Sequence, residues 1–176
     1  MVKEIRGRKL NLLIESSEIT QKVHDLGRQI TEDYADKDLL IIGILKGSFI
    51  FVADLIRSIQ LKTEIDFIRV SSYRDEMNPG DIELVTDLGV PIKDRDVLLV
   101  EDLLDTGGTL KFIREYILSK HPASFKICAL LNKKKARKSV IELGYVGFEI
   151  EDKFVVGYGT DFAEEGRNLP DIYVVE

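Results

Sequence analysis

Runs of hydrophobic residues alternate along the chain with stretches in which apolar positions recur every three or four residues. Four of these runs predict strands, and two of them are apolar enough for burial on both faces: 39–45, 65–70, 97–100 and 125–131. The stretch 17–34 has the period of an amphipathic helix, with Ser17 as its predicted N-cap. Two further helical faces follow strands along the chain: Val52, Leu55, Ile56 and Ile59, then Leu110, Ile113 and Ile117.

Strands that alternate with amphipathic helices predict a doubly wound α/β domain with a mainly parallel sheet. Three short apolar stretches near the C-terminus, at 146–150, 154–156 and 171–175, predict additional strands. A length of 176 residues suits a single domain with a proper core.

One polar stretch, 71–81, breaks this regular pattern because it is rich in turn residues and has no apolar period. Long loops in compact domains are often active-site lids, and we predict that role here. A plain hairpin connection is the alternative, since 82–85 has the pattern of a returning strand.

The charge pattern narrows the possible partners. The net charge is −6, which argues against broad nucleic-acid binding. The one cysteine, Cys128, lies in an apolar run and is predicted to be a buried thiol. No apolar run reaches the roughly twenty residues of a membrane span, and the first residues lack a signal-peptide core. We therefore expect a cytoplasmic protein without a membrane partner.

The candidate chemistry is concentrated between Asp96 and Leu110, where a buried strand leads into Glu101 and Asp102 and then into a Gly-rich helix start. Free amides at a helix N-terminus bind phosphate, and glycines let the backbone approach an anion closely. Carboxylates beside them suit ribose hydroxyls or Mg²⁺. The stretch has neither the Walker nor the dinucleotide-binding glycine pattern. An ordinary strand–turn–helix with solvated acids is the alternative.

Two lysines follow other predicted strands. Lys46 and Gly47 come directly after 39–45, where a parallel sheet gathers its ligand-binding loops, although a solvated loop lysine would have the same spacing. Lys133 opens a basic run after 125–131. That run could be a nucleic-acid patch, a localisation signal or a solvated face, or its first lysine could enter the site.

The sequence VLLVEDLLDTGGTL, at 97–110, is similar to the phosphoribosyl-pyrophosphate motif of type I phosphoribosyltransferases. The stretch GYVGFEIEDKFVVGY, at 144–158, resembles the hypoxanthine-guanine members of that family, of the bacterial type, and the resemblance spans nearly the whole chain. It implies a core sheet over roughly 36–140. It also implies a small hood made of the N-terminal segment and roughly 141–176.

The resemblance implies a purine salvage enzyme that transfers 5-phosphoribosyl from phosphoribosyl pyrophosphate to hypoxanthine and/or guanine, giving IMP or GMP and pyrophosphate. It implies Asp105 as general base and Lys133 as donor to the purine 6-oxo group. It also implies a homodimer or homotetramer, and a cis peptide between Leu45 and Lys46. Ser72 and Tyr73 would belong to the lid.

The implied binding residues fall into three groups. Phosphoribosyl pyrophosphate would contact Lys46, Gly47, Glu101, Asp102, Asp105, Thr106, Gly107, Gly108, Thr109 and Arg167. The purine would contact Lys133, Phe154, Val155 and Asp161, although the period of the sequence alone would place Phe154 in the core. The cofactor Mg²⁺ would be held by Glu101, Asp102 and Asp161.

Two other functions stay open. The first is a non-catalytic regulator that binds phosphoribosyl pyrophosphate. A broad basic face would support it, and the acidic net charge of the chain argues against it. The second alternative function is that of another phosphoribosyltransferase, with xanthine or a pyrimidine as its substrate. The VGFEI and DKFVVGY stretches argue against a pyrimidine substrate.

Overall fold

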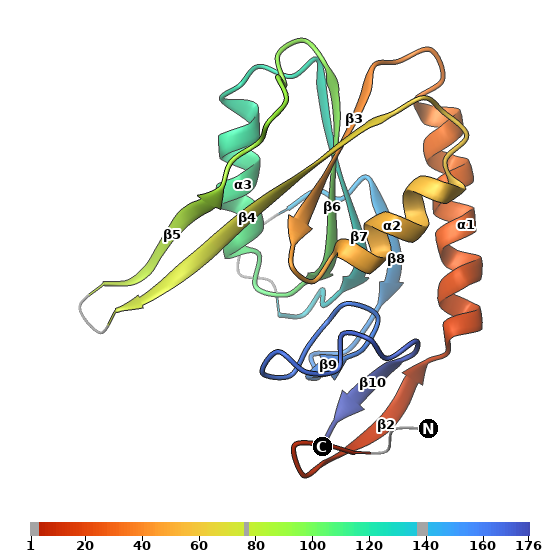
Figure 1. The fold of residues 1–176 in the computed structure, drawn as a ribbon, viewed down its shortest axis with the longest axis vertical. Helices are drawn as coiled ribbons and strands as arrows, with labels where there is room; N and C mark the ends of the chain where they lie inside the picture. The colour runs from red at the N-terminus through yellow and green to blue at the C-terminus, as the bar shows by residue number, and fades with distance from the viewer. Residues whose placement is uncertain (1–3, 76–77, 137–140) are drawn as a thin grey trace.

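The computed structural model describes residues 4–75, 78–136 and 141–176, with the backbone alone at 72–75 and 78–81. Its larger sheet has six strands in the order β5-β4-β3-β6-β7-β8 (Figure 1). All neighbouring pairs in it are parallel except β4 with β5. The strands are β3 (Leu39–Leu45), β4 (Glu64–Asp75), β5 (Asn78–Thr86), β6 (Asp96–Leu104), β7 (Ser124–Asn132) and β8 (Tyr145–Glu149).

Helices cover both faces of this sheet. Helices α1 (Ser16–Asp33) and α2 (Phe49–Ser58) pack against one face, and α3 (Gly108–Leu118) packs against the other (Figure 1). The alternation along β3 follows this division, since Ile41 joins the apolar cluster of α1 and α2 whereas Ile42 joins that of α3. Buried apolar side chains on both faces explain why the central strands are continuously hydrophobic. The predicted doubly wound, mainly parallel fold is confirmed.

A second, antiparallel sheet of four short strands lies at the carboxyl end of the parallel strands (Figure 1). Its order is β1-β2-β10-β9, with β1 (Glu4–Ile5), β2 (Arg8–Ile14), β10 (Ile172–Val175) and β9 (Val155–Val156). It has a small apolar cluster of its own, which includes Leu10, Val156 and Tyr173. We call this sheet, with the loops after residue 150, the hood. It brings the two ends of the described chain together.

Several boundaries differ from those that the sequence predicts. Strand β8 belongs to the larger sheet and not to the hood, because it pairs in parallel with β7 as an edge strand. Strand β6 does not end before Glu101 but continues to Leu104, since β7 pairs with it over that whole length. The N-cap of α1 is Glu15 and not Ser17, because Glu15 and Glu18 form a reciprocal capping box.

The stretch 71–81 also differs from the predicted long loop. The ladder between β4 and β5 extends to Asp75 opposite Asn78, so the alternative of a hairpin is the one observed. Residues 76 and 77 lie outside the described residues.

Cys128 is fully buried in β7, and burial raises the pKa of its thiol, as predicted for a structural cysteine. Within the described ranges, no helix has both the length and the apolar character needed to cross a membrane.

Close packing of α1 on α2 depends on Gly27. A Cβ atom at this position would lie 2.5 Å from Ser58 Cβ and 2.7 Å from the Ser58 carbonyl oxygen. Alanine favours a helix over glycine by about 1 kcal/mol, but an overpacked contact costs about 1–3 kcal/mol. We expect Gly27→Ala to lower the free energy of unfolding by about 1–2 kcal/mol, measured by urea denaturation.

Gly108→Ala is the matched control, since a Cβ at this first residue of α3 would meet no atom within 4 Å. Equal or greater stability of Gly27→Ala relative to the wild type would show that the two helices do not need this close approach.

Candidate active site

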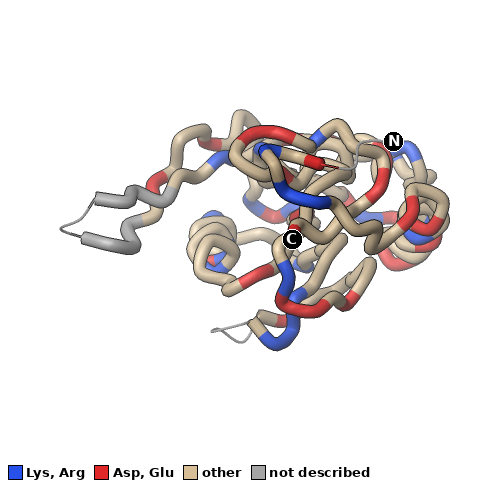
Figure 2. The backbone as a smooth tube through the Cα atoms, turned by 90° about the horizontal axis from the view of Figure 1, so that it is seen from below, with Lys and Arg blue, Asp and Glu red and all other residues tan. Residues whose placement is uncertain are grey.

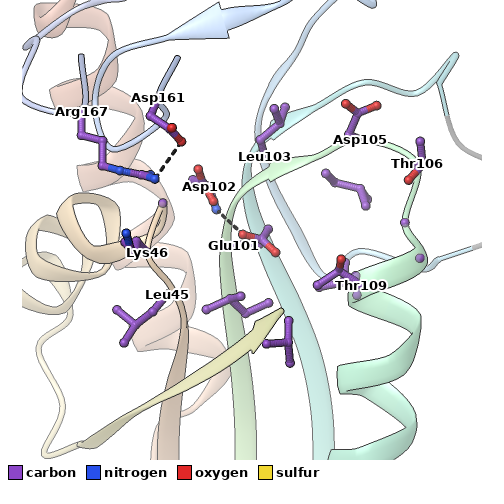
Figure 3. A pocket seen from close by; sticks show the side chains of 17 residues that line it. Leu45, Lys46, Glu101, Asp102, Leu103, Asp105, Thr106, Thr109, Asp161 and Arg167 are labelled. Carbon is purple, nitrogen blue, oxygen red and sulfur yellow. Dashed lines mark hydrogen bonds and ion pairs between the residues drawn. The ribbon is translucent and has the colours of Figure 1, made fainter. Parts of the chain in front are cut away.

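The site lies at the topological switch point of the larger sheet, where the chain connections from neighbouring strands run to opposite sides. From β3 the chain crosses through α2 to β4 on one side, whereas β6 pairs with the other side of β3. Ligands of open parallel sheets bind at the carboxyl ends of strands at such a point. A cavity of about 360 Å³ occupies this position (Figure 3). Its lining comes from the ends of β3 and β6, the start of α3, and Asp161 and Arg167 of the hood.

The start of α3 forms one side of the cavity. Gly107 is its N-cap, in the left-handed conformation with φ of 87°, and no side chain caps the helix. In the described part of the chain, the amide groups of Thr106 to Thr109 donate no hydrogen bond to protein. Four free amides at the positive end of a helix dipole form a site for an anion. Helix α1 differs, because a capping box of Glu15 and Glu18 occupies its N-terminus, whereas the N-terminus of α3 is free to bind a ligand.

Glu101 and Asp102 lie between the two sides of the cavity (Figure 3). Desolvation, and then the charge of Asp102, raise the pKa of Glu101 well above its usual range. Among the described residues, neither carboxylate has an ion pair with a lysine or arginine. An uncompensated pair of oxygen ligands suits Mg²⁺. The described residues contain no group of three or more potential ligands, so Asp161 is not gathered with this pair.

Lys46 and Arg167 form the opposite side of the cavity (Figure 3). Lys46 Nζ lies 2.9 Å from the Glu164 carboxylate, and Arg167 lies 3.4 Å from the same group. Arg167 is also 2.8 Å from Asp161, and it donates to the Gly159 carbonyl at 2.8 Å. Hydrogen bonds from Lys46 and then Arg167 hold the pKa of Glu164 below its usual range. Two cations therefore share one exposed acid.

The Lys46 loop packs closely against its neighbours. The Leu45–Lys46 peptide is cis, as the resemblance implies, and Ser48 Oγ donates to the Ile44 carbonyl at 2.6 Å. A Cβ atom on Gly47 would lie 2.0 Å from Asp102 Oδ2. The loop is thus wedged against the carboxylate pair.

Lys133 reaches the site from the end of β7. Its backbone N–H donates to the Leu104 carbonyl, which places it beside Asp105. Its ammonium group lies 3.2 Å from Asp105 and 3.4 Å from Asp152, with 6% of the side chain exposed. The next two lysines are exposed, in contrast to the buried Lys133. Arg137 and Lys138 lie outside the described residues.

Phe154 is not in the core, although the period of the sequence alone would place it there. It is 52% exposed and lies edge-on to Phe162, with ring centroids 5.4 Å apart. The neighbouring Val155 is buried in β9. An exposed aromatic ring can stack on a planar ligand. Neither residue lines the cavity itself, and Lys133 contacts its lining through Asp105 and the Leu104 carbonyl.

Two acids that the sequence analysis does not single out belong to this arrangement, Asp152 and Glu164. Asp152 stands within the DKFVVGY stretch and Glu164 within the hood loop before Arg167. Solvated acids of this kind carry no pattern, and only their ion pairs identify them. Ser72 and Tyr73 lie in β4, and their side chains are outside the described part.

The chain belongs to the phosphoribosyltransferase family: the model of the phosphoribosyl transferase domain matches residues 13–163. It is 46% identical to the hypoxanthine-guanine phosphoribosyltransferase of Aquifex aeolicus, over 99% of each chain. It is 43% identical to the hypoxanthine phosphoribosyltransferase of Escherichia coli, over 93% of each. A crystal structure of the Staphylococcus aureus hypoxanthine phosphoribosyltransferase superimposes with a TM-score of 0.90 at 44% identity, covering 94% of this chain and 91% of that one.

Gly47 provides a test of this geometry. Because its added Cβ would meet Asp102, Gly47→Ala must displace the loop or the carboxylate. We expect the dissociation constant for phosphoribosyl pyrophosphate, measured by calorimetry with Mg²⁺, to rise about tenfold or more.

Gly89→Ala is the control, since its added Cβ would lie 3.9 Å from the Asp66 carboxylate and needs no rearrangement. Unchanged affinity in Gly47→Ala would contradict the tight fit of the loop.

Proposed function

We propose that this protein transfers the 5-phosphoribosyl group from phosphoribosyl pyrophosphate to hypoxanthine and/or guanine, giving IMP or GMP and pyrophosphate in purine salvage. The observation that carries the proposal is one cavity that joins an open helix N-terminus, a carboxylate pair and two cations. The names of the similar proteins support the choice of a 6-oxopurine as acceptor.

In the proposed complex, phosphoribosyl pyrophosphate lies across the cavity with its 5′-phosphate at the start of α3 and its pyrophosphate at the opposite side. The free amides of Thr106 to Thr109 bind the 5′-phosphate, and the hydroxyls of Thr106 and Thr109 add donors. Glu101 and Asp102, in the middle, bind the ribose hydroxyls. The pyrophosphate then lies near Lys46, Gly47 and Arg167, whose charges stabilise it as it departs.

Glu101 and Asp102 are the protein groups that would hold Mg²⁺, with Asp161 nearby. When bound, the ion neutralises and orients the pyrophosphate oxygens. The carboxylates also favour the positive charge that develops on the ribose carbon as the leaving group departs.

The purine binds beyond the cavity, toward the hood. Phe154 stacks on the ring, the backbone of Val155 hydrogen-bonds it, and Asp161 lies near its edge. Lys133 donates to the 6-oxo group, and adenine is rejected because its amino group cannot accept that bond. Asp105 accepts the proton from N7 as the ring nitrogen attacks the ribose carbon.

Water must stay out of the cavity, because it would hydrolyse the activated sugar. The β4–β5 hairpin, with Ser72 and Tyr73, is the proposed cover. A cytoplasmic location and a homodimer or homotetramer remain predictions.

A regulator that binds phosphoribosyl pyrophosphate without catalysis is the second candidate. In the view of Figure 2, lysines and arginines are interleaved with acids along the backbone, and the net charge is −6. That arrangement gives little support to RNA binding. A salt-sensitive RNA complex at low protein concentration would favour this candidate.

The proposed reaction is tested by an ultraviolet assay with phosphoribosyl pyrophosphate, Mg²⁺ and hypoxanthine, guanine, xanthine or adenine in turn. We expect turnover with hypoxanthine, guanine or both, and none with adenine. Binding of phosphoribosyl pyrophosphate without turnover of any base would favour the regulator. Preferred turnover of xanthine would support the xanthine enzyme instead.

Asp105→Asn tests the general base in the same assay. A carboxamide cannot accept the proton, so we expect kcat to fall about 10²- to 10⁴-fold. Asp33→Asn is the control, because Asp33 pairs with Lys126 at 3.0 Å and does not line the cavity. Near-normal turnover of Asp105→Asn would remove the base role.

Glu164 is predicted to compete with pyrophosphate for the two cations, since its carboxylate pairs with Lys46 and Arg167. Exposed ion pairs are weak, so we expect Glu164→Gln to lower the KM for phosphoribosyl pyrophosphate by roughly threefold.

Glu165→Gln is the matched control, because this neighbouring acid pairs with Arg6 at 3.0 Å instead. Initial rates at varied phosphoribosyl pyrophosphate give both values. A higher KM in Glu164→Gln would mean that the acid positions the cations and does not compete for them.

A further inference from the structure

The ammonium group of Lys133 is held between two carboxylates. Asp105 lies 3.2 Å away and Asp152 lies 3.4 Å away, while 6% of the lysine side chain is exposed. A buried ammonium group is costly unless acceptors surround it. Lys133 donates a hydrogen bond to Asp105, and its contact with Asp152 is an ion pair.

The two acids differ in what the proposed reaction asks of them. Asp105 must accept a proton from the purine, and one of its carboxylate oxygens already accepts a hydrogen bond from Lys133. Asp105 therefore works best when Lys133 turns toward the purine. Asp152 has no such duty, and its side chain is 61% exposed.

We propose that Asp152 is a positioning residue that holds the Lys133 ammonium in place for the purine 6-oxo group and keeps it from pairing with Asp105 alone. The inference rests on the proposed function. Without Asp152, Lys133 would have Asp105 as its single carboxylate partner. Both the recognition of the oxo group and the availability of the base would then weaken.

The place of Asp152 in the chain supports this role. It lies on the connection between β8 of the larger sheet and β9 of the hood, two residues before Phe154. The start of that connection is tied to β7, because the Ile150 N–H donates to the Asn132 carbonyl at 3.0 Å. One short segment thus carries both the proposed stacking ring and the acid that holds the lysine.

The test compares two nucleotides, IMP and purine riboside 5′-monophosphate, which lacks the 6-oxo group. Calorimetry gives the ratio of their dissociation constants in wild type and Asp152→Asn. We expect the preference for IMP to fall about tenfold in the variant, while affinity for the analogue stays within about twofold. In the transfer assay, kcat with hypoxanthine falls and the KM for phosphoribosyl pyrophosphate does not change.

Asp152→Glu keeps the charge and should restore part of the preference. Glu149→Gln is the matched control, because it breaks the neighbouring pair between Glu149 and Lys134, 3.7 Å apart and exposed, and should leave the ratio unchanged. Thermal melting by circular dichroism verifies that Asp152→Asn is folded. A loss of affinity for both nucleotides alike would indicate a merely structural role and overturn the inference.

The outcomes separate this inference from the proposed function. A wild type that transfers to no base would refute the proposed function. A wild type that is active and prefers IMP, with the same preference in Asp152→Asn, would refute the positioning role alone. An active wild type that does not distinguish the two nucleotides would refute the assignment of Lys133 and the inference built on it.

Discussion

Parallel pairing of β3, β6 and β7 is the constraint on which the site depends. These strands bury apolar side chains on both faces, so their polar residues are left to the carboxyl ends, which meet at one edge. Lys46 follows β3, Asp105 follows β6 and Lys133 follows β7. The hydrogen bond from the Lys133 amide to the Leu104 carbonyl continues that register past the end of the sheet. Residues 28 positions apart in the sequence, Asp105 and Lys133, thereby come into contact.

The cations of the site are each balanced by an acid of the same chain. Lys46 pairs with Glu164, Arg167 with Asp161, and Lys133 with Asp105 and Asp152. Glu101 and Asp102 are the opposite case, since the described residues give them no cationic partner. An anionic substrate that carries a divalent cation would supply a partner to both sets of groups. Its oxygens would bind the lysine and arginine side chains, and its metal ion would bind Glu101 and Asp102. The free amides of α3 complete that arrangement at the phosphate end.

The hood is attached to the larger sheet through contacts near the cavity. It has a small apolar cluster of its own, and Ile14, Val155 and Ile172 also join the core cluster of α1 and α2, so both apolar packing and specific contacts connect it to the larger sheet. The Tyr158 hydroxyl donates to Asp54 of α2 at 2.6 Å, and within the hood the Gly159 N–H donates to the Arg167 carbonyl. A Cβ atom on Gly159 would lie 2.1 Å from the Gly47 carbonyl oxygen, which requires glycine where the hood meets the Lys46 loop. These contacts place Asp161 and Arg167 at the cavity.

The local residue pattern was enough to determine three features: the doubly buried strand Leu39–Leu45, the helical faces and the Gly-rich start of α3. It determined them because burial and helix geometry act over a few residues. The tertiary structure alone decided that β8 joins the larger sheet, that β6 runs on to Leu104 and that Phe154 is exposed. It alone paired Asp152 and Glu164 with the cations of the site. The pairing of β8 with β7, the Asp152–Lys133 pair and the Glu164–Lys46 pair join residues 17, 19 and 118 positions apart, and no local pattern encodes which distant groups a fold brings together.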